Sequence, residues 1–441
     1  MGHAAPHPAL RADLSPKGRG DIRASNMIAL PAATEHDALA LLTAQAVRSR
    51  AKLMLELGLR GELSHFTVHL DRMDGVADAV LATIAKAYPS LDIPFHARWR
   101  HFAIDGADRW DKIVSAASWP DRAARARAEF DLAIVSVLLD AGAGAAWRYK
   151  DAVSGKAIGR SEGLALASLD MFASGAFSNS ARDWFRVDAG KLAEFSASAL
   201  ERGFQVGADN PLVGLEGRAD LLRRLGRQMI SRKDIFGRRD TPRPGGLFDH
   251  LVAQGGGDAI AAPSILREVL LQLGPIWPSR LSLAGVSLGD CWKHPAIKTD
   301  NATSGLVPLH KLSQWLTYSL IEPLQRAGLE VNDIDGLTGL AEYRNGGLFV
   351  DLGVLALRDA DDAERAHEVD STLVVEWRSL TVALLDLLAE KVRARLHRDA
   401  ASLPLASLLE GGSWAAGRAA AYARRADGSP PIKVISDGTV F

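Results

Sequence analysis

The chain contains very little cysteine: Cys291 is the only one among 441 residues. A single thiol cannot form an intramolecular disulfide, and it cannot supply the paired cysteines of a structural zinc site. This scarcity fits a reducing compartment, so we expect a cytoplasmic protein. His294 follows three residues after Cys291, but nothing nearby in the sequence would lower the pKa of the thiol. Cys291 therefore reads as a small packed side chain, with a nucleophilic role as the alternative.

Long apolar runs and an excess of charge are also missing. No stretch approaches the ~18 apolar residues that cross a membrane, and residues 1–33 lack the apolar core of a secretory signal. The formal net charge is −1 at pH 7, whereas domains that hold nucleic acid by its phosphates are usually basic. We expect neither a membrane nor a nucleic acid as a partner.

The common cofactor and metal motifs do not occur either. The chain has no GxxxxGK[ST] loop, no strand-borne GxGxxG and no HExxH. Residues 142–146, GAGAA, follow a predicted helix, which is the wrong context for a nucleotide cradle. His65 and His69 are four residues apart on a short element, where ordinary polar contacts explain them better than a metal does. We expect no cofactor and no metal.

Helical periodicity dominates what is present. Apolar residues recur at helical spacing over residues 35–59, and Ser118, Pro120 and Gly142 bracket a helix that is hydrophobic nearly all round. Residues 366–397 predict one helix about 45 Å long. Residues 347–357 read as partly extended, and the C-terminus as a hairpin turning at Asp437 and Gly438. The sequence thus predicts a mainly α, compact multi-helix body with short β segments. It also predicts a disordered arm over residues 1–33 and one large helical catalytic domain over 34–441.

The most informative stretch is Leu337 to Leu357, LTGLAEYRNGGLFVDLGVLAL. It places two carboxylates, Glu342 and Asp351, together with Tyr343 and Arg344 around a glycine pair. Glycines permit close approach of a ligand, and charged groups among apolar residues are costly unless paired. The alternative is an ordinary surface turn with an Arg–Glu pair.

Further candidates lie in irregular segments and on two apolar helices. Residues 93–110 gather arginines and aromatics, including Arg98 and Arg100, and residues 274–297 offer Asp290, Trp292 and His294. Asp170 and Glu376 are carboxylates on otherwise apolar helical faces, which are seldom left unpaired. A cluster of acids beside arginines suits hydrolysis through a cationic transition state, with the arginines holding an anionic part of the substrate.

Several strings along the chain resemble a known family. FHARWRHF, VSVLLDAGAGAAWRY, RSEGLALASLDMFASGAFS, GDCWKHP, EYRNGGLFVD and SDGTVF together resemble the Urc-pathway uracil-catabolism proteins, from about residue 50 to the C-terminus. In that pathway uracil is degraded by way of nucleotide and ribosylurea-type intermediates. The resemblance implies a step on such a compound.

A more distant resemblance suggests the type of reaction. LTGLAEYRNGGLFVDLGVL is similar to the Ala-Asp-Tyr-Arg region of the queuosine-nucleotide N-glycosidases, helical proteins with a DNA-glycosylase-like architecture. Glu342 then stands at the position of that family's catalytic Asp, and Tyr343 and Arg344 match directly. By the same resemblance Phe172 and Phe177 face the substrate, and Glu376 and Arg378 fit a later Glu-x-Arg motif. Asn345-Gly346-Gly347 replaces a Val-Pro-Gln sequence, so base recognition must differ.

These observations lead to one functional hypothesis and one rival. We expect a hydrolase that cleaves the N-glycosidic bond of a pyrimidine-derived ribotide, ribosylurea 5-phosphate or a close relative, and releases urea. Glu342 is expected to activate water or to stabilise the oxocarbenium ion, with Asp351 as the fallback. Arg98, Arg100 or Arg344 would bind the phosphate, while Asp170, Asp290 or Glu376 would contact the urea. The rival is a non-catalytic ribotide-binding regulator or scaffold. The sequence leaves the oligomeric state open, a homodimer included.

Overall fold

The structure, a computed structural model, describes residues 32–237, 241–256, 258–277 and 281–435. Helices make up most of it, and the strands are two or three residues long. The predicted mainly α body is therefore confirmed. Nearly all of the predicted N-terminal arm lies outside the described residues, and Thr34 caps the first helix. Within the described part of the chain, no helix is long and apolar enough to cross a membrane.

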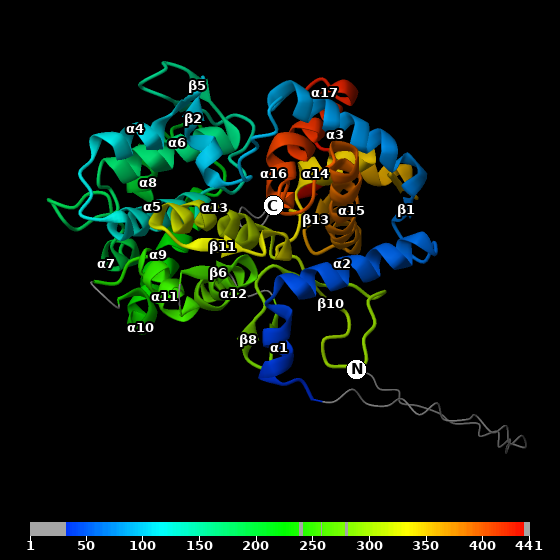
Figure 1. Cartoon of the computed structure of the whole chain (residues 1–441), viewed down its shortest axis with the longest axis horizontal. Helices are drawn as coiled ribbons and strands as arrows, with labels where there is room; N and C mark the ends of the chain where they lie inside the picture. The colour runs from blue at the N-terminus through cyan, green and yellow to red at the C-terminus, as the bar shows by residue number, and fades with distance from the viewer. Residues whose placement is uncertain (1–31, 238–240, 257, 278–280, 436–441) are drawn as a thin grey trace, which may run out of the picture.

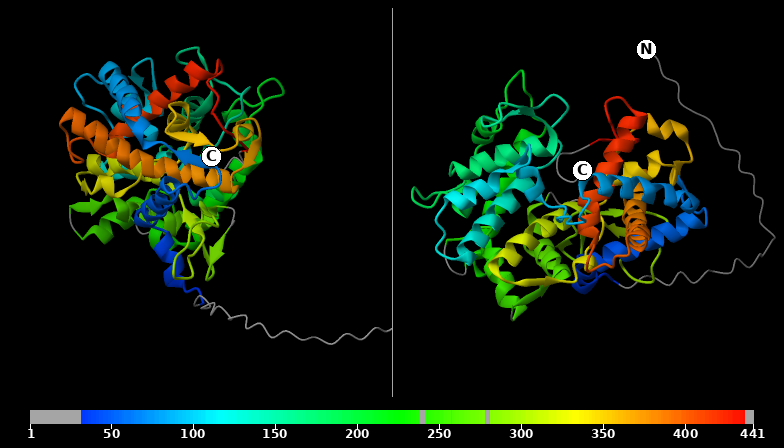
Figure 2. Two further views of the ribbon diagram at one scale, coloured as in Figure 1. Left: turned by 90° about the vertical axis from the view of Figure 1, so that its right-hand side faces the viewer. Right: turned by 45° about the horizontal axis from the view of Figure 1, so that its top comes forward.

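Two groups of helices stand side by side (Figures 1 and 2). The helices of the first group are α4 (Arg109–Ala116), α5 (Arg122–Leu138), α6 (Arg160–Ala173), α7 (Ala189–Ala193), α8 (Ala197–Gly203), α9 (Leu215–Ser231), α10 (Lys233–Phe236) and α11 (Gly246–Gly255). Those of the second are α2 (Ala44–Leu59), α3 (Met73–Ala87), α14 (Tyr343–Asp351), α15 (Thr372–Leu396), α16 (Leu405–Leu408) and α17 (Trp414–Arg424). Helix α12 (Ala262–Leu273) packs on α13 (Lys311–Ala327), which lies along α5, while α1 (Glu35–Leu41) precedes α2.

Each group is built around one helix that is buried nearly all round. Residues 128–138 of α5 and residues 373–385 of α15 are buried without interruption, as their apolar composition predicts. Helix α5 packs against α6 and α13, and α15 packs against α2, α3 and α14. These two central helices fix the positions of the shorter elements between the groups.

The described strands form two-stranded pairs, some of them local hairpins and others between segments far apart in the sequence. The antiparallel pairs are β1 (Phe66–Val68) with β12 (Leu355–Leu357), β2 (Ala103–Ile104) with β3 (Ala107–Asp108), β4 (Tyr149–Lys150) with β5 (Ala157–Ile158), β7 (Ser282–Leu283) with β8 (Val286–Ser287), and β9 (Cys291–Lys293) with β10 (Leu306–Pro308). The parallel pairs are β6 (Ala259–Ala261) with β11 (Glu330–Asn332) and β13 (Ala366–Glu368) with β14 (Lys433–Ile435). The first strand of the predicted C-terminal hairpin thus pairs with β13, and its turn lies outside the described residues.

Four predicted element boundaries differ from the structure. The helix bracketed by Ser118 and Gly142 spans Arg122–Leu138, because Asp121 rather than Ser118 is its cap. The helix predicted over 35–59 is interrupted at Leu42, and Thr43 caps the second part. The helix predicted to begin at residue 366 begins at Thr372, because Ser371 accepts a hydrogen bond from the Val374 amide.

The largest difference falls in the central stretch. Residues 347–351 are helical and only Leu355–Leu357 is extended. The close packing of α14 on α15 requires a glycine at position 346: a Cβ at Gly346 would lie 2.7 Å from Trp377 Nε1 and 2.8 Å from Thr381 Oγ1.

Candidate functional site

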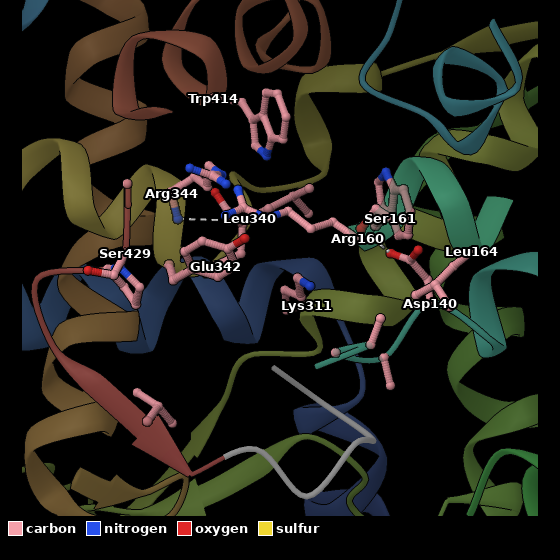
Figure 3. Close-up of a pocket in the computed structure, with 18 of the residues that line it drawn as sticks. Asp140, Arg160, Ser161, Leu164, Lys311, Leu340, Glu342, Arg344, Trp414 and Ser429 are labelled. Carbon is pink, nitrogen blue, oxygen red and sulfur yellow. Dashed lines mark hydrogen bonds between the residues drawn. The ribbon is translucent and has the colours of Figure 1, made fainter. Parts of the chain in front are cut away.

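A cavity of about 370 Å³ lies where the two helix groups meet (Figure 3). One wall comes from the loop after α5 and the start of α6, and the other from the start of α14, α17 and the segment before β14. The first turn of α13 forms part of the lining between them. The lining residues are His96, His101, Asp140, Ala141, Gly142, Ala143, Gly144, Ala145, Arg160, Ser161, Leu164, Lys311, Trp315, Leu340, Glu342, Tyr343, Arg344, Trp414, Gly428, Ser429, Pro430, Ile432 and Val434.

Glu342 lines this cavity as the cap of α14. Its carboxylate accepts hydrogen bonds from the amides of Arg344 at 2.8 Å and Asn345 at 2.6 Å, one on each oxygen. Two fixed amides at a helix N-terminus hold the carboxylate in one orientation. Since a carboxylate offers about four lone-pair sites, acceptor capacity remains for a ligand. The sequence places Glu342, Tyr343 and Arg344 together, and all three line the cavity.

Arg344 is a buried cation without an acid. Its side chain is 4% exposed, and its guanidinium lies 5.1 Å from the ring of Tyr343 and 5.5 Å from that of Trp414. Among the residues that the structure describes, no carboxylate lies within ion-pair distance of it. Because a buried charge is costly unless it is paired, the site is suited to an anionic group of a ligand.

Two more cations line the cavity without an acid, considering only the described part of the chain. Lys311 is the first residue of α13, and Arg160 is the first residue of α6; neither side chain has a hydrogen-bond or ion-pair partner there. Burial lowers the pKa of Lys311, and the charges of Glu342 and Asp140 partly offset that effect. Figure 3 shows Lys311 between the labelled acids Glu342 and Asp140.

Asp140 lines the cavity with its charge already compensated. It accepts from Arg98 Nη1 at 2.6 Å and from the Ser161 hydroxyl at 3.0 Å. Arg98 is fully buried behind the wall and also donates to Ser136. Arg98 and Arg100 were both expected to bind the phosphate, but each pairs with an acid of the chain. Arg98 pairs with Asp140, and Arg100 pairs with Glu322 at 2.9 Å. Neither arginine is among the lining residues.

A buried ion pair supports the cavity from behind. Arg378 on α15 donates twice to Asp290, at 2.9 and 2.8 Å, and its Nε donates to the carbonyl of Ala341. Asp290 in turn accepts from the backbone amide of Lys311 at 2.9 Å. Burial raises the pKa of Asp290, but Arg378 and these hydrogen bonds outweigh burial and hold it well below its ordinary value. The pair thus holds the backbone at Ala341, next to Glu342, and at Lys311, while neither Arg378 nor Asp290 is among the lining residues.

The other predicted residues of this region are also supporting groups. Trp292 donates to Asp290 at 2.6 Å. Glu376 is fully buried, as its place on the core side of the helix predicts, and accepts from the amides of Ser64 and His65. His294 lies 3.3 Å from Glu376. None of these three is among the residues that line the cavity.

Four predicted residues lie away from the cavity. Asp351, at the far end of α14, forms a two-point ion pair with Arg425 at 2.8 and 2.6 Å. Asp170 accepts from the Tyr149 hydroxyl at 2.6 Å, and burial raises the pKa of Asp170. Phe172 and Phe177 are packed in the core, against Trp110 and Phe195 respectively. The structure gives none of these four a place in the cavity wall.

Sequence reasoning missed Lys311, Arg160, Asp140 and Trp414, and it set aside the GAGAA loop that the structure places in the wall. A single charged residue at the end of a predicted helix does not indicate, from its sequence neighbours, that it shares a cavity with residues elsewhere in the chain. The loop was discounted because it follows a helix, yet its composition was the available signal. No group of three or more His, Cys, Asp or Glu side chains suited to a metal occurs among the described residues.

The protein is thus a mainly α protein with a cavity in which the carboxylate of Glu342 lies among three cations. Residues 40–441 match the family described as "Protein of unknown function (DUF1688)", and the chain belongs to that family. "Protein urg3" of Schizosaccharomyces pombe is 40% identical over 412 residues, covering 91% of this chain and 98% of the relative. "Uracil catabolism protein 4" of Lachancea kluyveri is 39% identical over 413 residues, covering 86% and 93%. The resemblance to uracil-catabolism proteins seen in the sequence is confirmed.

Proposed function

We propose that this protein acts in uracil catabolism as a hydrolase that cleaves the N-glycosidic bond of ribosylurea 5-phosphate or a close pyrimidine-derived ribotide. The observation that carries this proposal is the carboxylate of Glu342, which two amides hold in a cavity lined by Arg160, Lys311 and Arg344. None of these three cations has an acidic partner within the described ranges. The name "Uracil catabolism protein 4" of a relative supports the pathway. The resemblance of the Glu342 segment to N-glycosidases supports the reaction type.

The chemistry required of the cavity is simple. The bond between sugar C1 and the urea nitrogen breaks with its electron pair going to nitrogen, which leaves positive charge on C1 and the ring oxygen. A fixed carboxylate stabilises that charge because its attraction grows as the charge develops. Water then adds to C1, and in the net reaction its proton goes to the departing nitrogen. The products are ribose 5-phosphate and urea.

Urea release by the purified protein alone tests the proposal. With synthetic ribosylurea 5-phosphate as substrate, we expect urea and ribose 5-phosphate in equal amounts and in multiple turnovers. The rival function, a ribotide-binding regulator or scaffold, predicts binding without product. A calorimetric titration on the same protein sample separates the two, because binding with no urea release identifies the rival.

The 5-phosphate is expected to matter strongly. A hydrogen bond to a charged group contributes about 1.5–3 kcal/mol, so two such contacts predict a kcat/KM at least about 10²-fold higher for the phosphorylated substrate than for free ribosylurea. The measurement compares kcat/KM for the two compounds at one ionic strength. Equal values for both would contradict a phosphate-binding role for the cavity cations.

Activity is expected to survive removal of divalent metals. Stabilisation of an oxocarbenium ion needs negative charge and water, which Glu342 and solvent supply, so the proposed reaction has no step for a metal. The experiment dialyses the protein against EDTA and measures urea release before and after. Loss of activity that one particular ion restores would show that a metal takes part.

A further inference from the structure

The loop after α5 is held in an unusual way by one arginine. Arg218 on α9 is 2% exposed and donates to the carbonyls of Leu139 at 3.2 Å, Ala141 at 2.5 Å and Gly142 at 3.0 Å. It also donates to the carbonyl of Val213, whose own amide donates to the carbonyl of Ala143 at 3.2 Å. Three successive carbonyls, those of residues 141 to 143, are therefore bound on the side of the loop that faces α9.

The amides of the same peptide units must point the other way. In a trans peptide the N–H lies opposite the C=O, so the N–H groups of residues 142 to 144 are directed away from Arg218. These residues line the cavity. Within the described ranges, no acceptor meets the amides of residues 142 to 145. Successive backbone amides that share one direction form a concave site for an anion.

The start of α6 adds to this site. Helix α6 is fourteen residues long and has no side-chain cap, and Arg160 and Ser161 of its first turn line the cavity. Two other helices that begin at the cavity have an acid of the chain at their first amides: Asp290 accepts from the first amide of α13, and Glu342 caps α14. Only α6, of these three described helices, leaves its N-terminal amides to solvent or a ligand.

Three cations complete the arrangement. Lys311 and Arg160 have no acidic partner among the described residues, and the same holds for Arg344, of which only 4% is exposed. The one acid on this wall, Asp140, is neutralised by Arg98 at 2.6 Å. Backbone amides without an acceptor and cations without an acidic partner, among the described residues, thus face one cavity from several elements.

We infer that the loop amides of residues 142–144 and the first turn of α6, with the side chains of Arg160 and Lys311, form the subsite for the phosphate monoester of the ligand. This inference rests on the proposed function for the identity of the ligand, but it concerns binding alone. Arg218 is a positioning residue that turns the loop amides toward the phosphate. The sugar then extends from this wall toward Glu342 on the opposite one.

Titration with ribose 5-phosphate, and with ribose as the unphosphorylated control, tests the subsite without any reaction. Arg160→Gln removes an exposed charge and is expected to weaken the binding of ribose 5-phosphate about 10- to 100-fold, which is the effect of losing one charged hydrogen bond. Arg398→Gln, an exposed arginine in the loop after α15, is the matched control and should leave affinity unchanged. Equal affinity of wild type and Arg160→Gln would overturn the assignment.

Two further measurements separate a ligand role from a structural one. Lys311→Met removes a partly buried charge with no partner, so it should melt at or above the wild-type temperature while losing ribose 5-phosphate affinity. Hydrogen exchange of the peptide spanning residues 141–146 should slow with ribose 5-phosphate and not with ribose. A lower melting temperature for Lys311→Met, or no protection of that peptide, counts against the subsite.

The outcomes distinguish the subsite from the proposed function. If ribose 5-phosphate binding depends on the phosphate and on Arg160 but the protein releases no urea, the subsite is supported and the hydrolase proposal is wrong. If Arg160→Gln still releases urea and ribose 5-phosphate does not slow hydrogen exchange in the loop, the hydrolase proposal is supported and the phosphate binds elsewhere.

Discussion

Glu342→Gln is expected to lower kcat for urea release by about 10²–10³, or ~2.7–4 kcal/mol of transition-state stabilisation. The substitution keeps the size of the side chain and removes the negative charge that a developing oxocarbenium ion requires. The ground-state sugar carries no positive charge, so ribose 5-phosphate affinity should change far less than kcat. Both quantities are measured on the same protein preparation, by steady-state kinetics and by calorimetric titration.

The cap role of Glu342 must be separated from its charge. A glutamine can accept only one of the two amide hydrogen bonds from Arg344 and Asn345, and weakening a helix cap costs about 1 kcal/mol of folding stability. Kinetics are therefore compared well below the melting temperature of both proteins. A loss of kcat that tracks loss of folded protein would reflect the cap alone.

Asp351→Asn is the matched control. It makes the same change from carboxylate to amide at the other end of α14, in the ion pair with Arg425 and outside the cavity wall. We expect this variant to lose some stability and to keep its kcat. Wild-type turnover in Glu342→Gln with a dead Asp351→Asn would move the catalytic role to Asp351. Full turnover in both would reject an N-glycosidase mechanism based on this stretch.

Helix content and the two central helices could be predicted from the sequence because their signals are local. Apolar residues nearly all round α5 and an apolar stripe along α15 predict burial, and Glu376 lies on the core side of α15 as its spacing indicates. The break at Leu42 and the helical state of Gly346 and Gly347 could not be predicted in the same way. Gly346 is helical because α14 approaches α15 closely, and that contact exists only in the tertiary structure.

The candidate site was predictable only where its residues are contiguous. Glu342, Tyr343 and Arg344 stand together in the sequence and line the cavity together. Arg160 and Lys311 reach it from two other helix ends, and no pattern in the sequence links segments so far apart. Asp351 has the same local setting as Glu342, but nine helical residues carry it away from the cavity to Arg425.

Among the proposed substitutions, breaking the buried ion pair of Arg378 and Asp290 is expected to have the largest effect on stability. Arg378→Met leaves the Asp290 carboxylate buried without its cation, although Trp292 and the Lys311 amide still donate to it. Breaking one partner of a buried pair typically costs about 3–5 kcal/mol. We expect a loss of that size in the free energy of unfolding, measured from denaturant midpoints at constant m-value.

The double variant Arg378→Met with Asp290→Leu separates stability from positioning. Replacing both charges with apolar groups removes the uncompensated carboxylate, so most of the lost free energy of unfolding should return. Turnover should not return with it, since residue 378 no longer donates to the Ala341 carbonyl beside Glu342, and residue 290 no longer accepts a hydrogen bond from the Lys311 amide. A double variant that recovers kcat along with stability would show that the pair contributes to folding alone. Recovery of stability with a persistently low kcat and unchanged global fold would show that the pair sets the backbone geometry on which both Glu342 and Lys311 depend.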